Sequence, residues 1–173
     1  MPVLTCFRAG VLSAILLPLG GILPSLARES YFVVEANSGR ILLAEGSDQK
    51  RPVASLTKVA TAIVALDWAK ATGTDLGSEM VVPPSVASLG GSNPMELKPG
   101  DRISIRNALY SALMGSDNSA AQSLAHHVGF ALQQARGTTG DPVKNFVSEM
   151  NTLAAELGMR RTRFSTPHGL YVQ

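Results

Sequence analysis

The chain has 173 residues, of which 45% are hydrophobic and 16% are charged, and its formal net charge is +2. This balance is typical of a globular chain with one moderate core, and it excludes a disordered polyelectrolyte. The basic residues are scattered rather than gathered in a stripe with aromatic residues, so nucleic acid is not expected as a partner.

Residues 1–27 have the pattern of a secretory signal peptide. Arg8 precedes an apolar stretch over residues 11–26, and Ala27 offers a small residue at the cleavage position. Prolines and glycines interrupt the stretch, which disfavours the alternative of an uncleaved anchor helix. We therefore expect a mature chain of residues 28–173 in the periplasm. The only cysteine, Cys6, lies within the signal, so a mature chain would contain neither a disulfide nor a thiol nucleophile.

A hairpin and a helix are predicted next. Residues 31–36 and 41–45 are predicted to form two short strands. The turn between them contains Gly39, which can adopt a positive φ. A helix is expected to begin near Ser55 and to end at Gly73. Apolar residues recur along it at helical spacing, at Val59, Ile63 and Leu66.

Polar loops with prolines and glycines are expected up to Asp101, followed by three helices. The first begins at Ser104 and ends at Gly115, and the second begins at Asp117 or Asn118 and extends to Val128. Residues 137–140 are expected to form a loop. Asp141 and Pro142 then predict the N-terminus of the third helix, whose apolar stripe is Phe146, Met150, Leu153 and Leu157 and whose cap is Gly158.

Ser55-Leu56-Thr57-Lys58 is the first motif that indicates chemistry. Residues three apart on a helix share one face, so the two polar side chains can meet. A serine hydroxyl becomes a nucleophile when a base takes its proton, and lysine can be that base only in its neutral form. Apolar neighbours of Lys58 favour that form. A second S-x-x-K, at residues 47–50, lies in a polar loop that would not align its side chains.

Ser116-Asp117-Asn118 forms an S-x-N pattern at a predicted helix start. Serine, aspartate and asparagine are the residues preferred at helix N-caps, so the pattern taken alone fits a cap. Together with Ser55 and Lys58, it offers a hydroxyl that can relay a proton and an amide that can hold a peptide carbonyl. S-x-x-K followed by S-x-N is the pattern of a serine acyl-enzyme site.

Three longer stretches carry a more specific resemblance. Residues 54–58, 91–101 and 157–170, in this order, resemble the serine-type D-alanyl-D-alanine carboxypeptidases, the low-molecular-mass penicillin-binding proteins. The resemblance extends over nearly all of residues 28–173. It implies a mixed α and β fold of the β-lactamase and transpeptidase type, in which helices flank an antiparallel sheet and a helical lobe is added.

The resemblance also implies a function, removal of the terminal D-alanine from peptidoglycan stem peptides. By motif, Ser55 would be the nucleophile, Lys58 its general base, Ser116 a proton relay and Asn118 a contact to the substrate backbone. β-Lactams would acylate Ser55. No metal or other cofactor is implied, His168 would shape a turn, and a C-terminal region could allow peripheral association with the membrane.

The family's third motif, K-T-G, does not occur in the 173 residues. We therefore expect residues 28–173 to be an incomplete, C-terminally truncated catalytic domain that lacks the later strands and has impaired activity, since one oxyanion donor and the cation for the substrate carboxylate would be missing. Two alternatives remain. A class A β-lactamase shares the first two motifs, although no E-x-x-L-N follows Asn118. A truncated, non-catalytic paralogue would explain the absent motif.

Overall fold

The computed structural model describes residues 29–170, so the predicted signal peptide lies outside the described residues. The described residues divide into two compact units, residues 29–47 and residues 48–170. Within the described part, no helix is both long enough and apolar enough to cross a bilayer.

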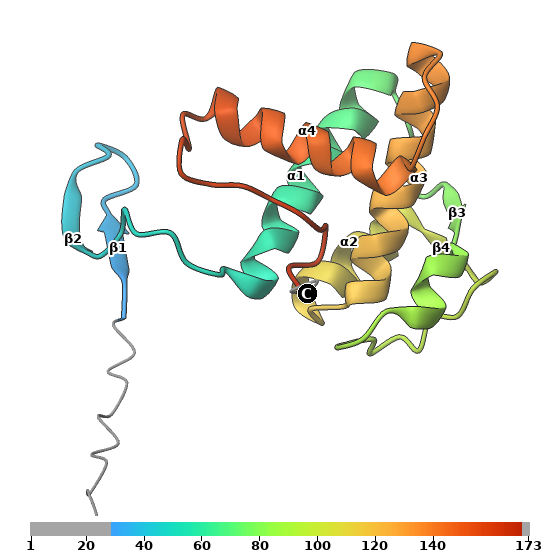
Figure 1. The fold of residues 1–173 in the computed structure, drawn as a ribbon, viewed down its shortest axis with the longest axis horizontal. Helices are drawn as coiled ribbons and strands as arrows, with labels where there is room; N and C mark the ends of the chain where they lie inside the picture. The colour runs from blue at the N-terminus through green and yellow to red at the C-terminus, as the bar shows by residue number, and fades with distance from the viewer. Residues whose placement is uncertain (1–28, 171–173) are drawn as a thin grey trace, which may run out of the picture. The chain divides into compact units, whose positions relative to one another are not determined.

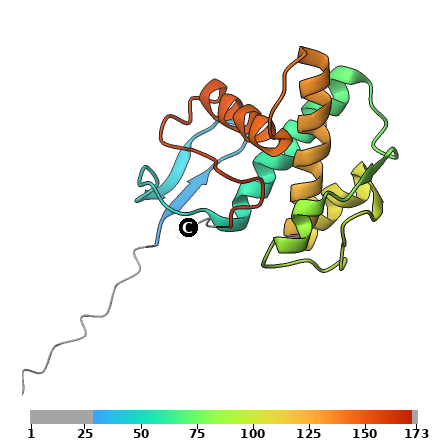
Figure 2. The same cartoon turned by 45° about the vertical axis from the view of Figure 1, so that its right-hand side comes forward.

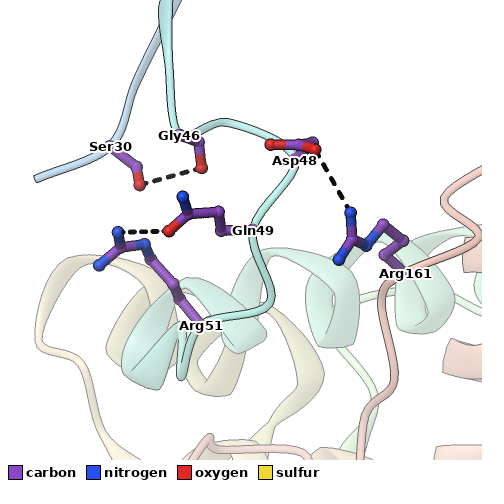
Figure 3. Close-up of polar contacts among 6 residues, drawn as sticks. All are labelled: Ser30, Gly46, Asp48, Gln49, Arg51 and Arg161. Carbon is purple, nitrogen blue, oxygen red and sulfur yellow. Dashed lines mark hydrogen bonds and ion pairs between the residues drawn. The ribbon is translucent and has the colours of Figure 1, made fainter. Parts of the chain in front are cut away.

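The first unit contains the predicted hairpin. Strand β1 (Tyr31–Val34) pairs antiparallel with β2 (Ile41–Glu45), and Gly39 in the turn adopts a φ of +70°. The hydroxyl of Ser30 donates to the carbonyl of Gly46 at 3.1 Å and closes the open end of the hairpin (Figure 3). Every residue of both strands is exposed within the described structure, so backbone pairing is the main interaction that holds these strands together.

The second unit is mainly helical (Figure 1). Its helices are η1 (Ala54–Leu56), α1 (Thr57–Thr72), η2 (Pro84–Ser88), α2 (Ile105–Met114), α3 (Asn118–Arg136) and α4 (Pro142–Glu156). Their shared core includes fully buried side chains from three of the long helices, among them Ile105, Leu124, Val128, Phe146 and Met150. All the predicted helices are thus present, although α3 continues past Val128 and the α-helical part of the first begins after Ser55.

Side-chain caps fix where the last three helices begin. The Ser104 hydroxyl accepts a bond from the backbone N–H of Asn107 at the start of α2. Asp141 accepts from the N–H of Val143 at 2.8 Å, and Pro142 occupies the first turn of α4. The predicted Asp-Pro start of α4 is confirmed, because the cap satisfies an N–H that has no partner within the helix.

A small sheet lies where only loops were expected. Strands β3 (Glu79–Val81) and β4 (Arg102–Ser104) pair antiparallel, with Met80 opposite Ile103 and both side chains buried. Each strand has three residues, too short for a recognisable alternation of polar and apolar positions. The pairing also joins segments that are far apart in the sequence, which local periodicity cannot reveal.

The apolar residues of α1 that recur at helical spacing remain exposed within the described structure, and another face of the helix is buried. Val59, Ile63 and Leu66 are 50%, 37% and 42% exposed within the described structure. The buried face instead carries polar residues, alanines and one valine, namely Thr57, Lys58, Thr61, Ala62, Val64, Ala65 and Ala69. The inward face of α1 therefore contains the residues that the first motif singled out.

The segment after α4 returns to the beginning of α1, as both views show (Figures 1 and 2). The Asn151 amide holds the start of this segment, since it donates to the Phe164 carbonyl and accepts from the Phe164 N–H, each at 2.9 Å. Arg161 forms an exposed ion pair with Asp48 at 3.3 Å (Figure 3). These contacts bring residues 166–170 against the N-terminal end of α1.

Candidate active site

Three predicted site residues meet at the N-terminal end of α1. The Lys58 ammonium nitrogen lies 3.0 Å from the Ser55 hydroxyl and 3.4 Å from the Ser116 hydroxyl. The Ser116 hydroxyl lies 2.8 Å from that of Ser55. The three polar atoms thus form a closed triangle of hydrogen bonds.

Backbone geometry places both serines. Ser55 lies in η1, one short turn before α1, and Ala54 before it has a φ of +44°. Ser116 directly precedes the cap of α3 and has a φ of +55°. Positive φ is unfavourable for residues with a side chain, and such strain persists only where the surrounding structure holds it. Both hydroxyls therefore owe their positions to locally strained backbone.

The environment of Lys58 favours the neutral amine. Its side chain is 1% exposed, and burial lowers the pKa of the ammonium group, while the carboxylate of Asp117 acts in the opposite direction. Lys58 is therefore buried, although the groups that its nitrogen contacts are polar. A lysine with a lowered pKa is able to accept a proton from a neighbouring hydroxyl.

The number of partners around Lys58 also suits proton transfer. Besides the two serines, its nitrogen donates to the carbonyl of His168 at 3.1 Å. A protonated amine has three N–H donors for these three oxygens. A neutral amine has two, so it can donate to the carbonyl and to Ser116 while its lone pair faces Ser55. The same geometry therefore accommodates both protonation states.

Asp117 is the residue that caps the N-terminus of α3. Its carboxylate accepts the backbone N–H of Ala120 at 3.0 Å and the hydroxyl of Ser111 at 2.8 Å, and the residue is fully buried. The middle residue of the S-x-N motif is therefore the N-cap. This arrangement leaves the Ser116 hydroxyl to the triangle.

Asn118 is buried against a loop. Its amide nitrogen donates to the carbonyl of Gly90 at 3.1 Å, and its backbone N–H donates to the carbonyl of Ser92 at 2.8 Å. Gly91 has a φ of +82°, and a Cβ there would lie 2.3 Å from the Asn118 amide nitrogen. The loop can approach Asn118 this closely only because position 91 is glycine.

His168 helps to form a tight turn, as expected from the sequence. Its Nδ1 accepts the backbone N–H of Leu170 at 3.1 Å. Burial, and after it the charge of Lys58, lowers the pKa of the imidazole to about 4. At neutral pH the ring is therefore uncharged and is committed to the turn.

An open pocket of about 380 Å³ lies beside the triangle. Its wall combines the three polar site residues with apolar side chains from η1 and the residue before it, from α1 and from α2. The lining residues are Val53, Ser55, Leu56, Lys58, Val59, Ala112, Leu113 and Ser116. Within the described residues, no group of three or more His, Cys, Asp or Glu side chains could hold a metal ion. The pocket gives a ligand direct access to the Ser55 hydroxyl.

Several contributors were missed by the sequence analysis. Thr61 donates its hydroxyl to the carbonyl of Pro167 at 2.6 Å, next to the His168 carbonyl that Lys58 contacts. Backbone carbonyls have no signature in a sequence. The spacing of Thr61, three residues after Lys58, was the available signal, because it places both side chains on the same face of the helix.

Comparison with known proteins gives a consistent result. The family model of the D-alanyl-D-alanine carboxypeptidases, Peptidase S11, matches residues 22–173. The chain is 32% identical over 149 residues to a D-alanyl-D-alanine endopeptidase of Escherichia coli, with 86% of this chain and 43% of the relative covered. It is also 32% identical over 152 residues to the D-alanyl-D-alanine carboxypeptidase DacA of Haemophilus influenzae, with 85% and 35% covered. The chain thus spans less than half the length of these relatives.

Solved structures support the same fold. The D-alanyl-D-alanine carboxypeptidase DacD of Francisella tularensis superposes with a TM-score of 0.70 at 32% identity, over 83% of this chain and 32% of that one. The Streptomyces K15 DD-transpeptidase superposes with a TM-score of 0.68 at 26% identity, over 82% and 52%. The mixed α and β fold expected from the sequence is confirmed, and this chain covers part of the length of these proteins.

Proposed function

This chain belongs to the Peptidase S11 family of D-alanyl-D-alanine carboxypeptidases, and from that premise we propose that it removes the terminal D-alanine from peptidoglycan stem peptides through an acyl-enzyme on Ser55. The observation that carries the proposal is the triangle formed by Ser55, Lys58 and Ser116, with distances of 3.0, 3.4 and 2.8 Å. It opens onto a pocket large enough for a peptide end.

In the acylation step, the Ser55 oxygen attacks the carbonyl carbon of the D-Ala-D-Ala bond while its proton passes to the neutral amine of Lys58. The backbone N–H of Ser55, near the start of α1, is the candidate donor for the oxyanion that develops. Asn118 would donate its amide to a carbonyl of the substrate backbone, the kind of acceptor that it already binds at Gly90.

The leaving D-alanine then needs a proton. Lys58, now charged, donates to the Ser116 oxygen, and the Ser116 hydroxyl passes its own proton to the departing nitrogen as the carbon–nitrogen bond breaks. An ester on Ser55 remains, and water hydrolyses it to restore the hydroxyl. A β-lactam would follow the acylation half of this path and leave Ser55 blocked.

The family assignment also bears on where the chain is located and on whether residues 28–173 contain the whole active site. A signal peptide at residues 1–27 would deliver the chain to the periplasm, where its substrate lies, and a C-terminal region could add peripheral membrane association. The resemblance assigns a further oxyanion donor and the cation for the substrate carboxylate to a K-T-G strand. Because residues 28–173 contain no K-T-G, this stretch by itself should acylate slowly.

An endopeptidase activity is a second candidate, because one of the relatives is a D-alanyl-D-alanine endopeptidase. The attacked carbonyl would belong to D-alanine in both reactions, and only the leaving amine would differ. The triangle of Ser55, Lys58 and Ser116 would serve either reaction, so substrate choice would depend on the space beside the leaving group.

The test measures products from two substrates, a stem pentapeptide and a cross-linked peptide dimer. It uses the full chain, meaning a form of this protein that extends through a K-T-G strand, because residues 28–173 alone should acylate slowly. Release of free D-alanine from the pentapeptide supports the carboxypeptidase, and cleavage of the dimer alone supports the endopeptidase. A Ser55→Ala variant is the control and should release neither product. If that variant were as active as the unaltered chain, the proposed nucleophile would be wrong.

A further inference from the structure

Helix α1 contacts the turn formed by residues 166–170 through two consecutive backbone carbonyls. The Lys58 nitrogen donates to the His168 carbonyl at 3.1 Å, and the Thr61 hydroxyl donates to the Pro167 carbonyl at 2.6 Å. Lys58 and Thr61 are one helical turn apart on the buried face of α1. The two contacts together fix the position of residues 166–170 along the axis of α1.

Both donors of this pair are deeply buried. Thr61 is 0% exposed and Lys58 is 1% exposed, so water cannot readily replace either bond. The Thr61 hydroxyl also lies 3.8 Å from the sulfur of Met150 on α4. A buried carbonyl that loses its donor is destabilised by its incomplete hydrogen bonding, so the turn would shift to find another partner.

The turn is also braced from within. The Thr166 hydroxyl accepts the N–H of Gly169 at 3.0 Å, and the His168 ring accepts the N–H of Leu170. A Cβ at Gly169 would lie 1.9 Å from the Ala54 carbonyl, so the turn packs closely against the residue before Ser55. These contacts join Pro167 and His168 within one compact turn, so a shift at Pro167 should move the His168 carbonyl as well.

We propose that Thr61 is a positioning residue that fixes the His168 carbonyl, which in turn aims the Lys58 amine at Ser55. The inference deepens the proposed function and rests on it. Lysine has a flexible four-carbon stem, so its nitrogen is placed by its partners rather than by its backbone. The neutral amine of Lys58 has two N–H bonds, which the His168 carbonyl and the Ser116 oxygen accept. Its lone pair can then face only Ser55.

The chain offers matched variants for a test. Thr61→Val keeps the branched shape beside Met150 and removes the donor, whereas Thr61→Ser keeps the donor. Ser123→Ala is the control for loss of a buried hydroxyl elsewhere, because Ser123 is 0% exposed and donates to the Ser119 carbonyl at 2.7 Å within α3. Thermal melts of the full chain establish that every variant compared is folded at the assay temperature.

The first readout does not depend on activity. Carbon-13 relaxation gives the order parameter of the Lys58 Cε, which should be high in the unaltered chain and in Thr61→Ser and Ser123→Ala, and should fall in Thr61→Val. If Lys58 remained equally ordered in Thr61→Val, Thr61 would be a structural hydrogen-bond donor only and the inference would be overturned, whether or not the chain proved to be an enzyme.

The second readout is acylation by a fluorescent penicillin at several concentrations, which separates the acylation rate constant from the binding constant. A misplaced base should lower the rate constant about 10- to 100-fold and leave binding unchanged. Thr61→Ser should recover most of the rate, and Ser123→Ala should not lose it. Equal rates in Thr61→Val and the unaltered chain would contradict positioning. An unaltered chain that is never labelled would contradict the proposed function, and the order parameter would still decide the role of Thr61.

Discussion

The Ser116 hydroxyl lies 2.8 Å from the Ser55 hydroxyl, although the two serines are 61 positions apart in the sequence. They approach from different elements, Ser55 from the turn before α1 and Ser116 from the residue before the cap of α3. Lys58 bonds to both of them. A proton that leaves Ser55 therefore has a route to Ser116 through a single nitrogen.

Replacement of Lys58 by arginine should be as damaging as replacement by alanine. An arginine side chain keeps a positive charge in this pocket but remains protonated, so it cannot accept the serine proton. The rate of labelling by a fluorescent penicillin is the measurement, with both variants assayed beside the unaltered full chain. Near-normal labelling of Lys58→Arg would show that the residue supplies charge and not a base.

Two substitutions of Ser116 should distinguish the catalytic role of its hydroxyl from the strain of its backbone. Ser116→Gly and Ser116→Ala both remove the relay hydroxyl and should slow acylation about 10²- to 10⁴-fold. Glycine tolerates the φ of +55° at this position, whereas alanine does not, so the glycine variant should be more stable by about 1 kcal/mol. Urea unfolding and penicillin labelling of the same samples test both parts. Unchanged labelling would exclude the relay.

The sequence predicted the helices well because their ends have chemical signals. Asp141 with Pro142, and Gly73 with its φ of +68°, mark ends that local preferences determine. The hairpin around Gly39 was predictable for the same reason. The S-x-x-K spacing also predicted the contact between Ser55 and Lys58, because residues three apart on a helix lie on the same face.

What the sequence did not reveal depends on contacts between distant segments. Val59, Ile63 and Leu66 recur at helical spacing as predicted, yet they are exposed within the described structure, because α1 turns its polar residues toward residues 166–170. Periodicity identifies the helix, but it does not show which other segments cover its faces. The two carbonyls that hold Thr61 and Lys58 could not be predicted either, since they belong to the backbone.

The crossing of α3 and α4 should depend on Gly129. A Cβ at this position would lie 1.9 Å from the carbonyl oxygen of Pro142, so Gly129→Ala should destabilise the fold by about 1–3 kcal/mol despite the better helix propensity of alanine. Gly90→Ala is the matched control, because nothing lies within 4 Å of its Cβ, and it should change stability by less than about 0.5 kcal/mol. Equal melting curves for the two variants would contradict the close packing.

Acid should weaken the fold through His168. Its pKa is lowered from 6.5 to about 4 by burial and by Lys58, so between these values the unfolded chain binds a proton that the folded chain does not. The free energy of unfolding should therefore be highest above pH 6.5 and should fall as the pH decreases toward 4. Urea unfolding at several pH values measures it.

His168→Asn provides the comparison for that titration, because it keeps an acceptor for the Leu170 N–H and does not titrate. Burial lowers the pKa of His127 as well, so this residue contributes a slope of the same sign and is left unchanged in both chains. The variant should lose stability less steeply between pH 6.5 and 4. Parallel curves would show that His168 is not the group that titrates.

Mass mapping of a penicillin adduct tests the central claim most directly. The full chain is incubated with a penicillin, digested and sequenced by mass spectrometry, with Ser55→Ala as the control. We predict one covalent adduct, on the Ser55 oxygen, that is absent from the control and slowed by Lys58→Ala. An adduct on another residue, or equal labelling of Ser55→Ala, would contradict the assignment of Ser55 as the nucleophile.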